Sequence, residues 1–180
     1  MGYSDIAGKQ RIVAVCGVKN SGKTTLLERI VKELSKRELK IAVIKHDGHD
    51  FSCDIPGTDS YRLKEAGAYG TAVFSDARVF IHKTGAGDYA RGLIEMFPEA
   101  DVIFLEGMKD TAFPKIEVIR EGISRLPVSN REGRFLIVTD KDPGDYEEET
   151  ARFEEIEQIA DRILRRISPE KKAGKGVSER

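Results

Sequence analysis

The strongest constraint on this chain is an eight-residue motif near its start, Gly17–Thr24, which reads GVKNSGKT. It matches the pattern G-x-x-x-x-G-K-[ST] at every fixed position. The two glycines allow backbone angles that a Cβ would forbid, so successive N–H groups can point at one anion. A short apolar strand is predicted over residues 12–16 and a helix over 23–37. The motif therefore predicts a phosphate-binding loop between a buried strand and a helix.

The last residues of this motif carry its chemistry. The Lys23 ammonium should reach the β- and γ-phosphates of a nucleotide, and the Thr24 hydroxyl should ligate Mg²⁺. A later apolar strand, over residues 102–105, ends in Glu106, whose carboxylate can hold an Mg²⁺-bound water or orient the attacking water. We therefore predict Lys23 and Glu106 as catalytic residues, and Thr24 and Glu106 as residues of the metal site.

Apolar patterns along the rest of the chain alternate between strands and helices. Strands are expected at 41–44, 71–74, 79–82, 102–105, 115–120 and 135–138, the one at 115–120 with a wet face, and helices at 58–66, 88–97 and 150–167. This order predicts an α/β protein, a three-layer P-loop NTPase fold with a mostly parallel central sheet. We expect one nucleotide-binding domain over residues 10–167 and a disordered tail over 168–180.

Composition narrows the class of protein further. The 180 residues include 30 Lys plus Arg and 31 Asp plus Glu, a formal net charge of -1, which argues against a dedicated nucleic-acid binder. No apolar run approaches the roughly 18 residues of a membrane span, and the N-terminus has no apolar signal core. Cys16 and Cys53 are too few for a disulfide framework. We expect a cytoplasmic protein that binds neither membranes nor nucleic acid.

A polar loop over residues 45–59 follows the second strand, at the end of a parallel sheet where ligands collect. Its candidates for Mg²⁺ contact or water positioning are Asp47, Asp54 and Asp59. We interpret it as a switch loop that a γ-phosphate and Mg²⁺ would order. Two other interpretations stay open: a solvent-exposed polar loop, and a zinc or nickel site built from His46, His49 and Cys53.

Several sequence blocks together carry a family resemblance. They are the phosphate loop with Thr25, Ile44-Lys45-His46-Asp47, Asp54–Ser60 (DIPGTDS), Ala66-Gly67-Ala68 and Leu105–Lys109 (LEGMK). Over about residues 10–165 they resemble the molybdopterin-guanine dinucleotide biosynthesis protein B family, MobB. Met108 stands where that family usually has Phe.

The resemblance implies a homodimeric P-loop protein that binds GTP with Mg²⁺ and is at most a slow GTP hydrolase. It also implies a partner, the molybdopterin guanylyltransferase, and molybdopterin itself as a further candidate ligand. The resemblance further implies that phosphate is contacted by Gly17, Asn20, Ser21, Gly22, Lys23, Thr24 and Thr25. Asp47 and Asp59 join Thr24 and Glu106 as candidate metal residues, and His46 and Asp54 are assigned to the switch loop.

The segment after the strand at 135–138 reads TDKD, residues 139–142. Guanine-binding proteins often carry N-K-x-D in such a place. An Asp at 140 or 142 can accept from guanine N1 and N2, because a carboxylate complements that donor pair. We take Asp140 as the candidate for base contact. Since the spacing is not N-K-x-D, the preference for GTP over ATP comes from the resemblance.

Two other functions remain as alternatives at this level. A small-molecule P-loop kinase would add a lid of arginines, for which Arg120, Arg125, Arg131 and Arg134 are the candidates. A nickel or zinc metallochaperone GTPase would use the His and Cys residues of the 45–59 loop. Both share the phosphate loop with the favoured interpretation, so the motif alone does not separate the three.

Overall fold

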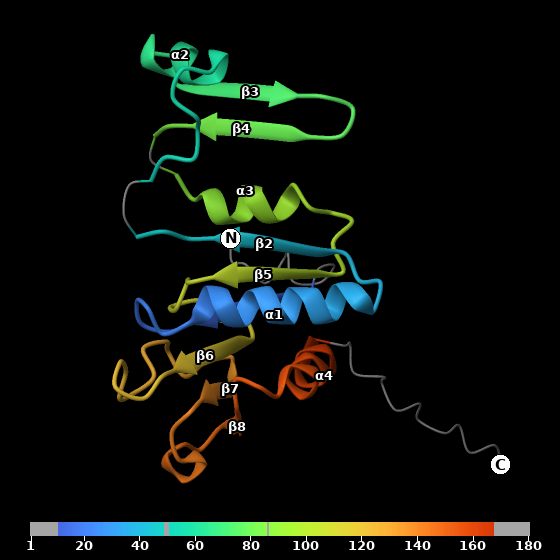
Figure 1. Cartoon of the computed structure of the whole chain (residues 1–180), viewed down its shortest axis with the longest axis vertical. Coiled ribbons are helices and arrows are strands. Elements are labelled where there is room, and N and C mark those ends of the chain that lie inside the picture. The colour runs from blue at the N-terminus through green and yellow to red at the C-terminus, as the bar shows by residue number, and fades with distance from the viewer. Residues whose placement is uncertain (1–10, 49–50, 86, 168–180) are drawn as a thin grey trace, which may run out of the picture. The chain divides into compact units, whose positions relative to one another are not determined.

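The computed structural model describes residues 11–48, 51–85 and 87–167. The chain divides into two compact units, one formed by residues up to His46 and from Leu93 onward, the other by Asp47–Gly92 (Figure 1). The tail expected over residues 168–180 lies outside the described residues. The sequence suggested a single domain over 10–167, and each unit is described below by itself.

The larger unit is built on a six-stranded sheet in which every neighbouring pair is parallel. Its strands are β1 (Ile12–Cys16), β2 (Ile41–Lys45), β5 (Val102–Glu106), β6 (Lys115–Ile119), β7 (Arg134–Thr139) and β8 (Glu149–Ala151), in the order β2-β5-β1-β6-β7-β8. Because parallel strands end at the same edge, the carboxyl end of β1 lies between those of β5 and β6. The register pairs Val15 with Glu106 and Cys16 with Glu117.

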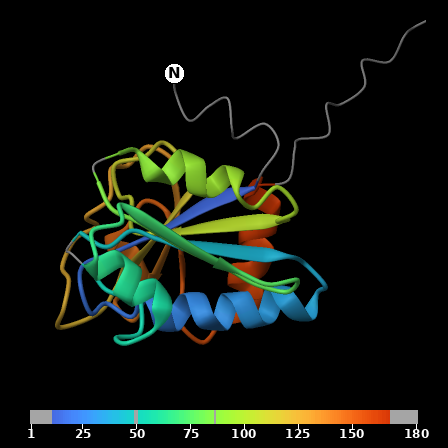
Figure 2. The ribbon, with the colours of Figure 1, turned by 90° about the horizontal axis from the view of Figure 1, so that it is seen from above.

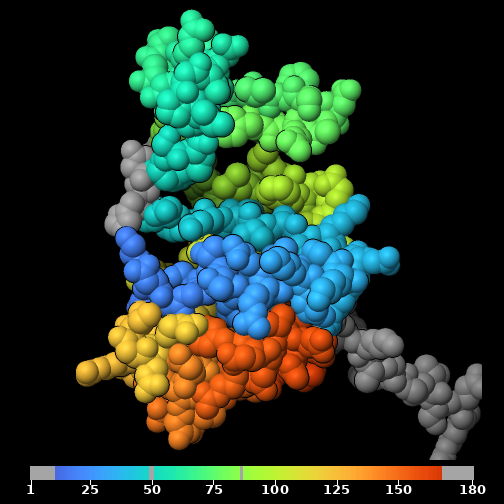
Figure 3. Space-filling view, in the orientation of Figure 1, coloured from blue at the N-terminus to red at the C-terminus, as the bar shows by residue number. Residues whose placement is uncertain are grey.

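Helices cover both faces of this sheet, as its apolar strands require. On one face α1 (Lys23–Lys36) and α4 (Ile156–Ile167) lie side by side over Val13 and Val15 of β1. On the other face Ile94, near the end of α3 (Tyr89–Glu95), packs with Ile12, Ala14 and Cys16. Figure 2 shows α1 and α3 on opposite sides of the strands, and Figure 3 shows α1 in blue against α4 in red. The expected three-layer α/β fold is confirmed.

The expectation of a wet face on the strand at 115–120 is wrong. All residues of β6 are buried, because β6 lies between β1 and β7 with both faces covered. The side chain of Lys115 is accommodated by the carbonyl oxygens of Thr111 and Glu132, to which its ammonium donates. Burial lowers the pKa of Lys115 from its ordinary value of 10.5. A charged residue in a strand therefore does not by itself indicate that this face of the strand is exposed to solvent.

The expected helix over 150–167 begins later than predicted. Residues Glu149–Ala151 form the edge strand β8, which pairs with β7 from Leu136 to Val138. The helix begins at Ile156, where the apolar residues first recur with helical spacing. The ladder hydrogen bonds to β7 thus replace the first helical turns that the sequence suggested.

The smaller unit holds α2 (Asp59–Glu65) and an antiparallel hairpin of β3 (Gly70–Phe74) and β4 (Val79–Lys83). Thr58 caps α2, because its hydroxyl oxygen accepts a hydrogen bond from the Tyr61 N–H. One hairpin face is largely exposed and apolar and consists of Ala72, Phe74, Val79 and Ile81. We call these four residues the open hairpin face. In the described parts of both units, no helix is long and apolar enough to cross a membrane.

Candidate nucleotide-binding site

The loop after β1 has the backbone that its glycines predicted. Gly17 has a φ of +144°, and a Cβ built there would lie 2.6 Å from the Val118 carbonyl oxygen and 2.8 Å from the Ser21 hydroxyl. Gly22, at a φ of +93°, ends the loop as the N-cap of α1. Neither position accepts a side chain without strain. The close approach to β6 explains why Gly17 is needed, which sequence spacing alone does not reveal.

The N-terminus of α1 is left free of competing groups. Gly22 provides no capping side chain, and the first turn of the helix contains no acidic residue. The first N–H groups of a helix have no intrahelical partner and carry partial positive charge. The Ser21 hydroxyl is buried without a hydrogen-bond partner among the described residues. This end of α1 therefore suits an anion such as a phosphate.

The Lys23 ammonium folds across this loop. Its Nζ donates to the carbonyl oxygens of Gly17, at 3.0 Å, and of Val18, at 2.7 Å. An ammonium has three donors, so one remains for a phosphate oxygen. The predicted phosphate lysine thus lies within the curve of the loop, next to the free N-terminus of α1.

Thr24 and Glu106, both predicted as residues of the metal site, contact each other beside the loop. The Thr24 hydroxyl donates to Glu106 Oε1 at 2.8 Å, and Lys45 Nζ lies 3.6 Å from the same oxygen. The Glu106 side chain is only 8 % exposed, and Lys45 offsets part of the cost of burying its charge. Hydroxyl and carboxylate oxygens are the ligands that Mg²⁺ prefers. These two residues therefore fit a magnesium site.

The backbone around Glu106 fixes this carboxylate. The His46 N–H donates to the Glu106 carbonyl at 2.9 Å, which extends the β2–β5 ladder by one residue. Gly107, at a φ of +99°, passes close to His46, where a Cβ would lie 3.2 Å from the His46 carbonyl oxygen. The Cys16 thiol donates to the Gly107 carbonyl at 3.1 Å, and burial, aided by the charge of Glu117, raises the pKa of Cys16 to about 12. Cys16 is therefore a packing residue.

Arg120 is a contact that we did not predict for this site. Its Nε donates to the Ser21 carbonyl at 3.4 Å, and its guanidinium lies 4.0 Å from the centre of the Phe153 ring. It also pairs with Asp140 at 3.6 Å. The sequence grouped Arg120 with the arginines of a possible kinase lid, whereas the structure places it against the phosphate loop. Arg120 directly follows β6, and β6 pairs with β1, so the two strand ends bring Arg120 next to the phosphate loop. The sequence does not show this strand pairing.

Two of the other candidate lid arginines, Arg131 and Arg134, pair with glutamates away from the phosphate loop. Arg134 lies in β7 and pairs with Glu148 at 2.7 Å, both side chains being nearly buried. Arg131 pairs with Glu147. These pairs hold the segments around β7 together, so no observation favours a kinase lid.

Asp140, our candidate for base contact, is engaged on both carboxylate oxygens. Oδ1 accepts from the Glu121 N–H at 2.7 Å, and Oδ2 pairs with Arg120. Arg152 donates to the carbonyl of Lys141 at 2.7 Å and so anchors the same turn. Asp140 thus links this turn to Arg120 and the phosphate loop, and its contact with guanine stays a prediction.

The acidic residues of the 45–59 segment belong to the smaller unit. Asp54 Oδ1 accepts from the hydroxyls of Thr58, at 3.2 Å, and Ser60, at 3.0 Å, so it stabilises the start of α2. The Asp59 side chain is 95 % exposed and lies 3.6 Å from Arg62. Asp47 is also exposed. The magnesium contacts predicted for Asp47 and Asp59, and the switch role predicted for Asp54, remain predictions.

A zinc or nickel site receives no support from the described residues. Among them, no group of three or more His, Cys, Asp or Glu side chains could hold a metal ion. His49, one of the three proposed ligands, lies outside the described part of the chain, and Cys53 is exposed.

A six-stranded parallel sheet, a G-x-x-x-x-G-K-T loop between β1 and α1, and a carboxylate at the end of the adjacent strand define a P-loop protein of the nucleotide-binding class. The family model for molybdopterin guanine dinucleotide synthesis protein B matches residues 12–140. The chain belongs to this family, MobB.

Curated relatives agree with this assignment. A Haemophilus influenzae protein is 33% identical over 158 residues, covering 84% of this chain and 86% of its own, and an Escherichia coli protein is 30% identical over 167 residues, covering 88% and 95%. Both are named molybdopterin-guanine dinucleotide biosynthesis adapter protein.

Solved structures agree as well. The crystal structure of Bacillus subtilis MobB is 26% identical, has a TM-score of 0.66, and matches 87% of this chain and 97% of its own. A MobB homologue from Bacillus stearothermophilus, at 16% identity and a TM-score of 0.64, matches 88% and 98% and shares the fold.

Proposed function

We propose that this chain is a GTP-binding accessory protein that assists the guanylyltransferase forming molybdopterin guanine dinucleotide. The observation that carries the proposal is the contact of Thr24 with Glu106 beside the Lys23-containing loop. It brings a phosphate-binding loop and two oxygen ligands together in one place. The adapter names of the relatives support the accessory role. This role would place the chain in the cytoplasm with its partner enzyme.

The chain's own groups would bind and orient MgGTP. The N–H groups at the start of α1 and the Lys23 ammonium would hold the phosphates. Thr24 and Glu106 would hold Mg²⁺, which neutralises phosphate charge when bound. An arginine finger contributes about 10³–10⁵ in rate, and Arg120 is held by Asp140 and Phe153 rather than free to act as one. We therefore expect slow hydrolysis, with binding and adapter activity dominant.

A homodimer is part of the proposal, and the smaller unit supports it. The open hairpin face exposes Phe74 at 83 % and Val79 at 64 %. An isolated two-stranded hairpin is marginally stable in water, and exposed apolar patches commonly mark association sites. A second copy of the chain would cover this face.

The direct test is a reconstituted transfer reaction with the guanylyltransferase, molybdopterin and MgGTP. Adding this chain should raise the yield of the guanine dinucleotide, and a pull-down should recover the transferase. The Lys23→Ala variant should lose the stimulation, because it lacks the phosphate lysine. Lys32→Ala, which removes another lysine of α1, is the matched control and should keep it. Equal yields with and without the chain, and no transferase in the pull-down, would refute the accessory role.

A further inference from the structure

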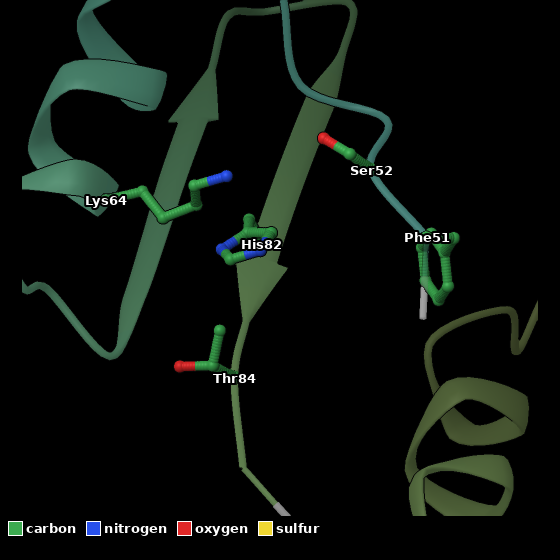
Figure 4. A pocket seen from close by; sticks show the side chains of 5 residues that line it. All are labelled: Phe51, Ser52, Lys64, His82 and Thr84. Atoms are coloured by element: carbon green, nitrogen blue, oxygen red, sulfur yellow. The ribbon is translucent and has the colours of Figure 1, made fainter. Parts of the chain in front are cut away.

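The smaller unit contains a pocket of about 440 Å³, lined by Phe51, Ser52, Lys64, His82 and Thr84 (Figure 4). Lys64 comes from α2 and His82 from β4, while Phe51 and Ser52 come from the loop before α2. All five residues lie within 47–92, so a single unit forms the pocket. No residue of the phosphate loop lines it, and the proposed adapter function does not use it.

The charge of this pocket favours an anion. Lys64 and His82 contribute an ammonium and an imidazole, and none of its described lining residues is acidic. Lys64 is partly buried and lies 4.6 Å from the centre of the Tyr61 ring. Among the described residues its paired carboxylate is that of Glu65 at 3.6 Å, which is 57 % exposed and therefore well screened by solvent. The positive charge is thus held in place with little neutralisation.

Two buried polar atoms beside the pocket have no hydrogen-bond partner among the described residues. They are Nδ1 of His82 and the hydroxyl oxygen of Thr71. Thr71 pairs directly with His82 across the hairpin, so the two side chains lie on the same face. Buried polar atoms are nearly always hydrogen-bonded in folded proteins. These two neighbouring atoms therefore have hydrogen-bonding capacity left for a bound group.

We propose that this pocket binds a phosphate group, either as free phosphate or as a phosphate monoester. Lys64 and Ser52 can donate to its oxygens, and His82 can donate from a ring nitrogen. The Thr84 hydroxyl already donates to the Tyr69 carbonyl at 2.9 Å, so it lines the pocket as an acceptor. Phe51 adds an aromatic wall against which the organic part of an ester would pack.

The test uses the full chain carrying Lys23→Ala, so that the phosphate loop does not dominate phosphate binding. Phenyl phosphate, inorganic phosphate and phenol are titrated separately. The imidazole NMR signals of His82, assigned with a His82→Gln variant, report binding at this pocket. Phosphate-containing probes should shift them in a saturable way. Lys64→Met should weaken this binding at least tenfold, while Lys64→Arg should retain it within about threefold.

Lys83→Met is the matched control. Lys83 is the next residue of β4, so its side chain lies on the opposite face from His82, and binding should change less than twofold. Tighter binding of phenyl phosphate than of inorganic phosphate would identify a monoester as the ligand, and equal binding would identify free phosphate. The proposal is overturned if neither probe shifts His82, if Lys64→Met binds as tightly as its parent, or if phenol binds as well as phenyl phosphate.

Discussion

The two units of this chain bury apolar side chains to very different extents. In the larger unit both faces of the sheet are covered, and Phe104 and Ile94 are fully buried. In the smaller unit Ser60 is the one buried residue among those described, while Phe74 is 83 % exposed. The larger unit thus has a core of its own. The smaller unit has almost no buried side chains among those described, so it depends on local hydrogen bonds.

The difference shows why the two units play different parts. The phosphate loop leaves the centre of a rigid sheet, so Lys23, Thr24 and Glu106 are held by the core beneath them. The smaller unit is ordered by the contacts of Asp54 at the start of α2 and by the β3–β4 ladder. An exposed apolar surface such as the open hairpin face would be stabilised most by binding a partner. This fits a protein that acts together with other chains.

The largest expected effect is on the free energy of unfolding, and it tests the difference in apolar burial between the two units. Phe104→Ala should lower the free energy of unfolding by about 3–5 kcal/mol, because it leaves a cavity in a fully packed core. Phe74→Ala should lower it by less than about 0.5 kcal/mol when measured on the monomer, because Phe74 is already in water. Urea titration followed by circular dichroism measures both values.

The same Phe74→Ala variant should weaken the proposed homodimer at least tenfold in sedimentation equilibrium. If it instead unfolds the monomer as strongly as Phe104→Ala does, the smaller unit has its own core and the comparison fails. If dimer affinity is unchanged, the open hairpin face is not the interface.

The next effect concerns the phosphate loop. Lys23→Ala should weaken GTP binding at least about 100-fold, because the ammonium supplies the positive charge closest to the phosphates. Calorimetric titration with MgGTP and MgATP measures the loss and the base preference together. Thermal unfolding without nucleotide should change little. An unchanged dissociation constant would contradict the phosphate assignment of this loop.

A smaller effect is expected at the proposed magnesium site. Thr24→Val keeps the shape of the side chain but removes the hydroxyl that contacts Glu106. It should raise the Mg²⁺ concentration needed for half-maximal GTP binding by about tenfold. Thr25→Val provides a neighbouring variant with the same change of chemistry. Identical Mg²⁺ dependence of Thr24→Val and the unmodified chain would exclude Thr24 as a ligand.

The smallest effect is the pH dependence of a single ion pair. Burial alone would raise the pKa of Glu148, but the hydrogen bond and charge of Arg134 more than offset this, so that pKa lies below its ordinary value of 4.5. A lowered pKa means that the pair stabilises the fold above pH 4.5 and loses this contribution as pH falls through the folded value. Glu148→Gln should therefore be less stable than the parent at pH 7, and the gap should narrow below pH 4.

The matched control for this pair lies in the smaller unit. Glu65 is 57 % exposed and, in the described part of the chain, forms an ion pair with Lys64, so Glu65→Gln should leave the acid unfolding profile unchanged. Denaturant titrations at a series of pH values measure both variants. A constant difference between Glu148→Gln and the parent from pH 7 to pH 3 would show that Arg134 does not hold Glu148 ionised.

The sequence by itself determined the parts that depend on neighbouring residues. The phosphate loop, the strand before it and the helix after it follow from a pattern confined to residues 12–37, where glycine geometry and apolar spacing act locally. The helix over 58–66 and the strands over 71–74 and 79–82 were predicted for the same reason. So was Glu106 as the carboxylate beside the loop, because it ends an apolar strand.

The tertiary structure decided the parts that depend on which strands are neighbours. Pairing of β1 with β5 brings Glu106 to Thr24, and pairing of β1 with β6 brings Arg120 to the phosphate loop. The same placement buries Lys115, whose charge had suggested an exposed face. These two pairings join residues that lie about 90 to 100 positions apart in the chain, and contacts over such distances leave no periodic pattern in the sequence.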